Sequence, residues 1–257
     1  MGKIVACVNQ KGGVGKTTTA VNLTSGVGRM GYKVLIVDAD PQGNTTSAYG
    51  VDKQGLSCSV YDLLIGKATA KAATVETPFD GVSIIPCNMD LAGAEVELIS
   101  IENRESQLKH ALNAVKSEYD YIFIDCPPSL GLITINALCA ADTLLVPIQC
   151  EYFALEGLSH LIGSVRQIKR LYNPTLELEG VLLTMYDGRL NLTQQVVGEV
   201  KRFFKKELYS TVIPRAVRLS EAPSYGMPIQ YYDPRNKGAK AYDDLAAEFV
   251  KRNGGRA

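Results

Sequence analysis

Short apolar runs alternate with longer segments of helical period along this chain. The runs predict β-strands near residues 3–9, 33–38, 82–86, 121–125, 143–148, 178–184 and 209–213. The segments between them repeat apolar residues three or four positions apart and predict helices over about 16–30, 91–116, 131–141, 155–172, 191–207 and 238–252. This alternation is typical of a mostly parallel, twisted sheet with helices on both faces, so the predicted fold class is α/β.

Size and composition favour one large domain. The 257 residues are 46% hydrophobic, enough to bury a substantial core, and no segment has the composition of a linker. We therefore expect a single domain over residues 1–257. No apolar run approaches the roughly 20 residues of a membrane-spanning helix, and the N-terminus lacks a secretory pattern. These features predict a cytoplasmic protein without membrane contact.

The distribution of charge and the spacing of cysteines indicate which kinds of binding site the chain can carry. The formal net charge is zero, but residues 1–149 carry 11 Lys and Arg against 15 Asp and Glu, while residues 150–257 carry 16 against 12. A surface that binds a polyanion is thus expected in the second half. The six cysteines are scattered without a CxxC pair, which argues against a disulfide framework and against a zinc site.

A glycine-rich loop, NQKGGVGKTT at residues 9–18, follows the first predicted strand and precedes a predicted helix. Such a loop aims backbone N–H groups and the positive end of the helix at a chain of phosphates. Lys16 is expected at the β- and γ-phosphates, and Thr17 is expected to place its hydroxyl on Mg²⁺. The common pattern G-x-x-x-x-G-K-[ST] fails at its first position, where Gln10 stands, and a second lysine, Lys11, lies inside the loop. The predicted phosphate-binding residues are Lys11, Gly12, Gly13, Val14, Gly15, Lys16, Thr17 and Thr18.

Two further motifs place carboxylates at strand ends. The string VDADPQGN carries Asp38 and Asp40, and the string IFIDCPP carries Asp125. The carboxyl ends of parallel strands are where ligands bind in open α/β sheets. Asp125 fits the acid that holds Mg²⁺ through a water in P-loop enzymes, and Asp40 lies within reach of a metal or an attacking water.

These motifs resemble the ParA/Soj family of chromosome- and plasmid-partition ATPases. The resemblance rests on KGGVGKTT, DADPQGN, FIDCPPSLGLITINAL and PRAVRLSEAPSYGMPIQYYDPRNKGAKAY, and it covers nearly the whole chain. The loop with two lysines is similar to that of the larger deviant Walker A group of P-loop proteins. The resemblance implies an ATP- and Mg²⁺-dependent ATPase that is slow until a partner stimulates it.

The resemblance also implies roles for individual residues. It assigns Lys11 to the partner's nucleotide across an ATP-sandwich homodimer and Gly12 to the close approach of two loops. Asp40 would orient the hydrolytic water, and Pro214 and Arg215 would join the nucleotide site. The implied catalytic residues are Lys11, Lys16 and Asp40, the metal residues are Thr17, Asp40 and Asp125, and the DNA-binding residues are Arg189 and Arg218.

The implied cycle is an ATP-driven switch on the nucleoid. The ATP-bound dimer binds double-stranded DNA without sequence preference, a ParB-type partner stimulates hydrolysis, and ADP releases a monomer. A MinD-like division-site ATPase is the alternative, although the segment AYDDLAAEFVKR at residues 241–252 is a weak candidate for a membrane-binding helix. An electron-transfer or cluster-carrier protein would need cysteines on a symmetric dimer surface, whereas Cys126 is expected to be a small buried residue at a strand end. A small-molecule ligase or kinase of related fold is disfavoured by Lys11 and by the second half, which resembles ParA/Soj.

Overall fold

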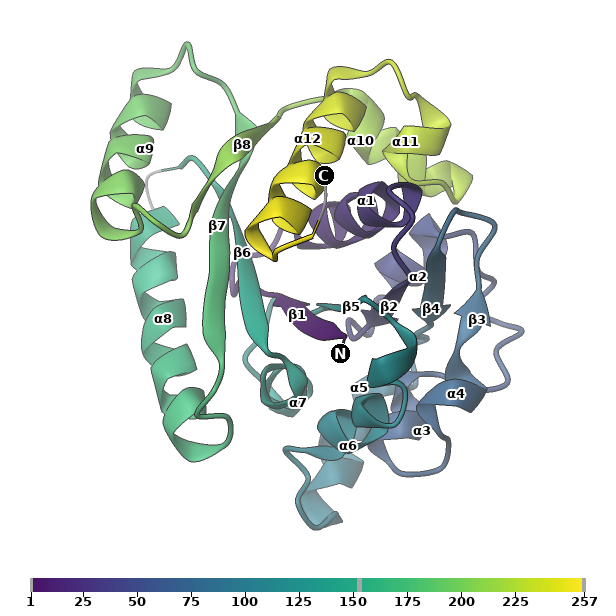
Figure 1. The fold of residues 1–257 in the computed structure, drawn as a ribbon. Helices are drawn as coiled ribbons and strands as arrows, with labels where there is room; N and C mark the ends of the chain where they lie inside the picture. The colour runs from purple at the N-terminus through teal and green to yellow at the C-terminus, as the bar shows by residue number, and fades with distance from the viewer. Residues whose placement is uncertain (1, 152–153, 256–257) are drawn as a thin grey trace.

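An eight-stranded sheet forms the centre of the protein (Figure 1). The structure, a computed structural model, describes residues 2–151 and 154–255. The strands are β1 (Lys3–Cys7), β2 (Val34–Asp38), β3 (Val75–Glu76), β4 (Val82–Ile85), β5 (Tyr121–Asp125), β6 (Thr143–Gln149), β7 (Glu177–Tyr186) and β8 (Leu208–Pro214). Their spatial order is β3-β4-β2-β5-β1-β6-β7-β8; β3 runs antiparallel to β4, and the other neighbours pair in parallel. The predicted fold class is confirmed.

Helices cover both faces of this sheet. The longer ones are α1 (Lys16–Arg29), α7 (Leu132–Ala140), α8 (Ala154–Leu171), α9 (Asn191–Phe203) and α12 (Lys237–Arg252). The shorter ones are α2 (Asn44–Ala48), α3 (Val60–Leu64), α4 (Ala70–Ala73), α5 (Leu91–Glu97), α6 (Gln107–Asn113), α10 (Val217–Glu221) and α11 (Ile229–Tyr232), with 3₁₀ turns η1 (Leu98–Ser100), η2 (Lys116–Glu118) and η3 (Ala222–Tyr225). Along β2, Val34 and Ile36 join the apolar cluster that includes α1 and α12, whereas Leu35 and Val37 join the cluster on the opposite face. The alternating side chains of the strands thus divide the core into two layers.

The prediction of one helix over 91–116 was wrong. The segment forms α5, the turn η1 and α6, and Asn103 between them has a left-handed φ of 53°. Leu98 and Leu108 are both buried, but ten residues at about 100° each would turn Leu108 roughly 80° away from Leu98 on one straight helix. Breaking the helix lets both leucines reach the core.

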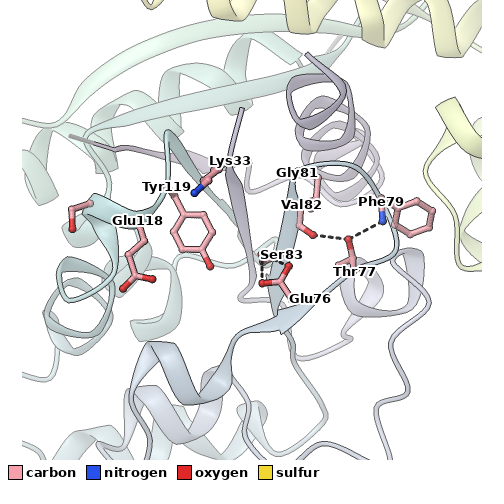
Figure 2. Close-up of a pocket in the computed structure, with 10 residues that line it drawn as sticks. Lys33, Glu76, Thr77, Phe79, Gly81, Val82, Ser83, Glu118 and Tyr119 are labelled. Atoms are coloured by element: carbon pink, nitrogen blue, oxygen red, sulfur yellow. Dashed lines mark hydrogen bonds between the residues drawn. The ribbon is translucent and has the colours of Figure 1, made fainter. Parts of the chain in front are cut away.

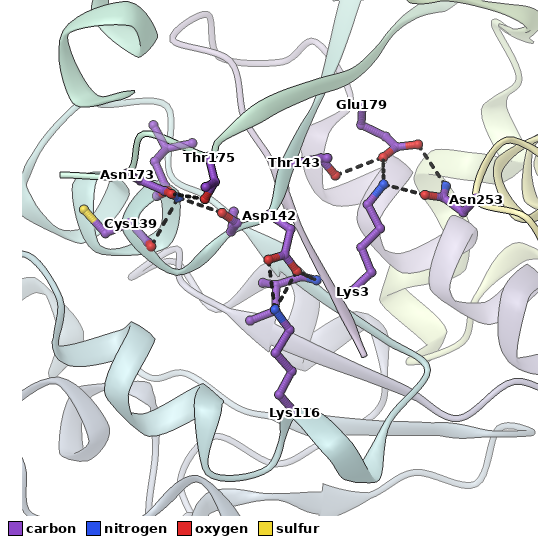
Figure 3. A network of polar contacts seen from close by, with 12 residues as sticks. Lys3, Lys116, Cys139, Asp142, Thr143, Asn173, Thr175, Glu179 and Asn253 are labelled. Atoms are coloured by element: carbon purple, nitrogen blue, oxygen red, sulfur yellow. Dashed lines mark hydrogen bonds and ion pairs between the residues drawn. The ribbon is translucent and has the colours of Figure 1, made fainter. Parts of the chain in front are cut away.

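A polar network ties together the amino ends of the strands (Figure 3). The Lys3 ammonium is 2.5 Å from Glu179, which also accepts hydrogen bonds from Thr143 and Asn253. Burial acts to raise the pKa of Glu179, but the hydrogen bond and charge of Lys3 and the hydrogen bonds from Asn253 and Thr143 together outweigh it, so the pKa is lowered. The network joins β1, β6, β7 and the residue after α12, at the end of the sheet away from the glycine-rich loop.

Within the described residues, no helix combines the length and the apolar character that crossing a bilayer requires.

Candidate functional site

The glycine-rich loop lies between the end of β1 and the start of α1. Helix α1 begins at Lys16, and Gly15 before it has a left-handed φ of 86°, a backbone conformation that residues other than glycine rarely adopt. Residues 12 and 13 are exposed, so the loop presents its backbone rather than side chains to solvent. A helix N-terminus that follows such a loop is a ready site for a phosphate group.

Hydrogen bonds from two polar side chains hold the loop on the sheet. Asn9 accepts from the backbone N–H of Lys11 at 3.0 Å and donates to the carbonyl of Pro147 at 2.8 Å. Thr184, at the carboxyl end of β7, donates to the carbonyl of Val14 at 2.8 Å. The loop is therefore anchored at both ends before any ligand binds, which lowers the entropic cost of ordering the loop on binding.

The two lysines of the loop point to different places. Lys16 is 7% exposed, and its ammonium donates to the carbonyl of Lys11 at 3.2 Å, within the curve of the loop. The Lys11 side chain is 40% exposed and its ammonium is 2.5 Å from a carboxylate oxygen of Glu151. Lys16 is thus placed for phosphates bound in its own loop, while Lys11 is turned toward the protein surface.

Two buried carboxylates lie next to each other at the ends of β2 and β5. Asp38 and Asp125 are direct partners in the parallel register of these strands, and neither is exposed to solvent. Asp40 follows two residues later, is 8% exposed and accepts a hydrogen bond from the backbone N–H of Gln42 at 3.0 Å. The structure therefore brings both predicted acids, Asp40 and Asp125, to the edge of the sheet that carries the loop.

The side chains at this edge fit a hydrated magnesium ion. Asp125 Oδ2 accepts from the hydroxyl of Thr45 at 2.7 Å, but Asp125 Oδ1 is buried and has no hydrogen-bond partner in residues 2–151 and 154–255. The Thr17 hydroxyl is near enough to this carboxyl to lower its pKa. A buried carboxylate oxygen without a partner is costly, and Mg²⁺ with its waters takes oxygen ligands of this kind.

Burial dominates the electrostatics of both acids. It raises the pKa of Asp125 to about 7; the charge of Asp38 adds to the rise, while the hydroxyls of Thr17 and Thr45 oppose it. Burial likewise raises the pKa of Asp38 to about 6, against hydrogen bonds from Thr46 and the backbone of Asp40. An edge that disfavours negative charge in the absence of a ligand is suited to a cation.

We expect the Asp125 contribution to the stability of the ligand-free protein to fall as pH rises from about 4 to about 7. The folded pKa of Asp125 lies above its unfolded value, so the folded state holds the extra proton and is favoured at low pH, and this contribution is lost on ionisation. Asp125→Asn removes the free-energy cost of a buried negative charge and should raise the free energy of unfolding at pH 8 by on the order of 2 kcal/mol, with little gain at pH 4. Thermal unfolding in EDTA across this range measures the difference, with exposed Asp52→Asn as control. A gain that does not change with pH would contradict the assignment.

A small cavity adjoins the loop on the β7–β8 side. Its volume is about 170 Å³, and its walls include Gly15, Thr18, Pro214 and Arg215. The structure thus brings the two residues predicted from the far end of the chain beside the phosphate loop. A cavity that starts at the helix N-terminus and is walled by a proline ring suits a flat base joined to bound phosphates.

A larger hollow, of about 630 Å³, lies elsewhere (Figure 2). It is lined by residues before or at the amino ends of the strands, such as Lys33 and Ser83, and by Glu76, whose carboxylate accepts from the Ser83 hydroxyl at 3.2 Å. The phosphate loop is at the carboxyl ends. This hollow is therefore separate from the candidate site.

The two arginines predicted to bind DNA are brought to one end of the molecule. Arg189 follows β7 and Arg218 lies in α10 after β8, and these strands are paired through Tyr186 and Pro214. Arg189 forms an ion pair with Asp187 at 2.6 Å, and Arg218 forms one with Glu221 at 2.7 Å. Both guanidinium groups are therefore partly neutralised by their own chain.

Sequence reasoning missed three groups at the site: Thr45, Thr184 and the Lys11–Glu151 ion pair. Thr45 comes directly after the DADPQGN string, and Thr184 ends a predicted strand, so their positions were visible as polar residues at the ligand edge. Their contacts were not, because each hydroxyl bonds to a segment far away in the sequence.

The fold and the loop together define a P-loop ATPase, and comparison with known proteins agrees. A family model described as an AAA domain matches residues 2–178. The chain is 56% identical to the sporulation initiation inhibitor protein Soj of Bacillus subtilis over 99% of this chain and 100% of that one. It is 49% identical to the chromosome-partitioning ATPase Soj of Treponema pallidum over the full length of both. The chain belongs to the ParA/Soj family of partition ATPases.

Solved structures show the same fold with nucleotide bound. Cobyrinic acid a,c-diamide synthase from Mycobacterium smegmatis, with ADP and magnesium, is 36% identical, with a TM-score of 0.86 over 99% of this chain and 96% of that one. The septum site-determining protein MinD from Pyrococcus horikoshii, with Mg-ADP, is 29% identical, with a TM-score of 0.82 over 99% and 98%. These relatives are consistent with a P-loop ATPase that uses nucleotide and Mg²⁺.

Proposed function

We propose that this protein is an ATP-dependent DNA-partition switch. The exposed outer face of the phosphate loop carries the proposal. A Cβ atom added at Gly12 would meet no described atom within 4 Å, so the packing of the part of the chain that the structure describes does not require glycine there. The glycine and the surface-directed Lys11 are then best explained by a second copy whose loop docks against this one when ATP is bound.

Each residue at the site has a separate role in the proposed ATPase reaction. Lys16 and the loop N–H groups hold the β- and γ-phosphates, and Thr17 and Asp125 hold the metal. A magnesium ion held by Thr17 and Asp125 would supply positive charge to offset the charge that develops on the phosphates. Asp40 orients the attacking water, and Lys11 from the second copy adds positive charge, so turnover is slow until the dimer and a ParB-type partner complete the site.

The alternative, a MinD-like protein on a membrane, is less well supported. Such a protein needs an amphipathic helix with a free apolar face. In α12 the apolar residues, including Tyr242, Leu245 and Phe249, are buried in the cluster shared with α1. The high identity to Soj proteins points the same way, so we propose a cytoplasmic, nucleoid-associated switch that serves a chromosome or plasmid.

The dimer is tested by substitution at the loop. Gly12→Val should bind ATP nearly as well as the parent but remain monomeric, because its branched side chain occupies the space where two loops meet. Gel filtration with ATP should show the parent at about twice its 27.8 kDa mass and the variant at the monomer position. Gly163→Val on the exposed side of α8 is the control and should dimerise normally. ATP-dependent dimerisation of Gly12→Val would overturn the sandwich model.

DNA binding is tested by reversing the charge of Arg189 and Arg218. Each variant removes two phosphate contacts per dimer, which should reduce the slope of log affinity against log salt by about 2 and weaken binding about tenfold or more near 0.1 M salt. Binding to unrelated duplexes over a salt series measures both quantities, after ATP-dependent dimerisation of each variant has been verified. The matched control is Arg29→Glu, which breaks an exposed ion pair with Asp243 of α12. Arg29 is the last residue of α1, at the end away from the phosphate loop. Unchanged slopes in both variants, or a strong preference for one sequence, would refute this surface or its mode.

A further inference from the structure

Two consecutive threonines at the start of α2 bond to two different buried acids. The Thr45 hydroxyl donates to Asp125 Oδ2 at 2.7 Å, and the Thr46 hydroxyl donates to Asp38 Oδ2 at 2.6 Å. All four residues are fully buried. Because Asp38 and Asp125 are register partners on neighbouring strands, α2 spans the two strand ends with one hydroxyl on each.

The two contacts leave the acids in different states. Both oxygens of Asp38 are occupied: Oδ2 also accepts from the backbone N–H of Thr46 at 2.7 Å, and Oδ1 accepts from the N–H of Asp40 at 3.3 Å. Asp125 has one oxygen bonded to Thr45, while among the described residues none forms a hydrogen bond with the other, Oδ1, although the Thr17 hydroxyl is near the carboxyl. Of the two acids, Asp125 is therefore the one with an oxygen to offer a ligand.

The surroundings of the two threonines also differ. Thr46 accepts a hydrogen bond from the N–H of Cys87 at 2.9 Å, so it joins β2, α2 and the segment after β4 into one scaffold. The hydroxyl of Thr45 makes its hydrogen bond to Asp125, across 80 residues of sequence. A hydrogen bond to one carboxylate oxygen restricts rotation of the carboxylate and so fixes the direction of the other oxygen.

We propose that Thr45 is a positioning residue for magnesium: its hydroxyl holds Asp125 so that Oδ1 faces the metal, whereas Thr46 belongs to the scaffold that carries Asp40. Partners of metal-binding carboxylates typically change metal affinity by about 10- to 100-fold when removed. Thr45 therefore sets the affinity for Mg²⁺, and Thr46 does not. The inference rests on the magnesium site proposed above.

The test compares isosteric variants by Mg²⁺-dependent ADP binding rather than by activity. Calorimetry of ADP binding over a Mg²⁺ series gives the Mg²⁺ midpoint, and binding in EDTA reports the phosphate loop alone. Thr45→Val should shift the midpoint upward at least tenfold, with ADP affinity in EDTA within about twofold of the parent. Thr46→Val should leave the midpoint unchanged and lower the thermal unfolding temperature.

A second pair of variants isolates the hydroxyl and covers the case in which valine prevents folding. Thr45→Ser and Thr45→Ala lose the same methyl group, but only serine keeps the donor. The serine variant should retain the parental midpoint and the alanine variant should show the shift. Equal midpoints for serine and alanine, or equal shifts for Thr45→Val and Thr46→Val, would overturn the proposal.

The Asp125→Asn variant distinguishes a failure of the inference about Thr45 from a failure of the proposed magnesium site. If Asp125→Asn leaves the Mg²⁺ midpoint unchanged, the magnesium site itself is misplaced. If Asp125→Asn removes the dependence on Mg²⁺ but Thr45→Val does not shift it, the site stands and the role of Thr45 is refuted.

Discussion

Lys16→Ala is expected to abolish nucleotide binding. The ammonium of Lys16 is nearly buried in the curve of the loop, and in the structure its hydrogen bond goes to the loop carbonyl of Lys11. A phosphate that replaces this carbonyl as acceptor pairs the ammonium with an opposite charge, and in a nearly buried site this attraction is stronger than in water. Without it, ATP affinity should fall at least about 100-fold, or about 2.8 kcal/mol.

Calorimetry with ATP and Mg²⁺ measures this loss. Lys53→Ala is the matched control, because the Lys53 ammonium also donates to a backbone carbonyl, that of Gln42 at 2.8 Å, but does so on the exposed surface. The control should bind ATP like the parent. A Lys16→Ala variant that binds ATP within about threefold of the parent would show that the loop does not hold the phosphates as proposed.

Asp40→Ala is expected to bind ATP and dimerise but to lose turnover. Its carboxylate accepts from the N–H of Gln42 through Oδ1, which fixes the side chain at the ligand edge without occupying the phosphate loop. Removing a group that orients the attacking water should lower kcat by about 100-fold or more and leave the affinity for ATP nearly unchanged.

Single-turnover hydrolysis together with gel filtration separates these effects. Asp40→Asn retains an oxygen that can accept from Gln42 but lacks the charge, so it distinguishes a role of the negative charge from a role in holding the loop. Both variants should form the ATP-dependent dimer. Hydrolysis by Asp40→Ala at the parental rate would exclude Asp40 from the chemistry.

Much of the fold was predictable because its signals are local. Strand β5 lies at residues 121–125 as predicted, since five consecutive buried residues between polar segments leave few other structures. The start of α1 at Lys16 follows from a glycine that adopts a left-handed φ directly before it. The sequence signal for the class of protein was also local, because a loop that binds phosphates needs glycines and a lysine at fixed spacing along one segment.

Hydrophobic periodicity gave a wrong prediction where one segment packs against several neighbouring helices. Residues 91–116 have helical spacing in two parts whose apolar faces do not align, and packing against α7 and α3 decided where the helix breaks. The two-residue strand β3 and the short helix α2 have too few residues for any period to be visible. Their existence depends on neighbours that the local sequence does not reveal.

The sequence alone indicated that the glycine-rich loop, Asp40 and Asp125 meet at one edge of the sheet, because the carboxyl ends of parallel strands lie together there. Tertiary structure alone decided what those residues touch: Thr45 reaches Asp125 across 80 residues, Lys11 reaches Glu151 across 140, and Thr184 reaches Val14 across 170. A hydrogen bond depends on atoms within about 3 Å, and only the folded chain brings such distant segments to that distance.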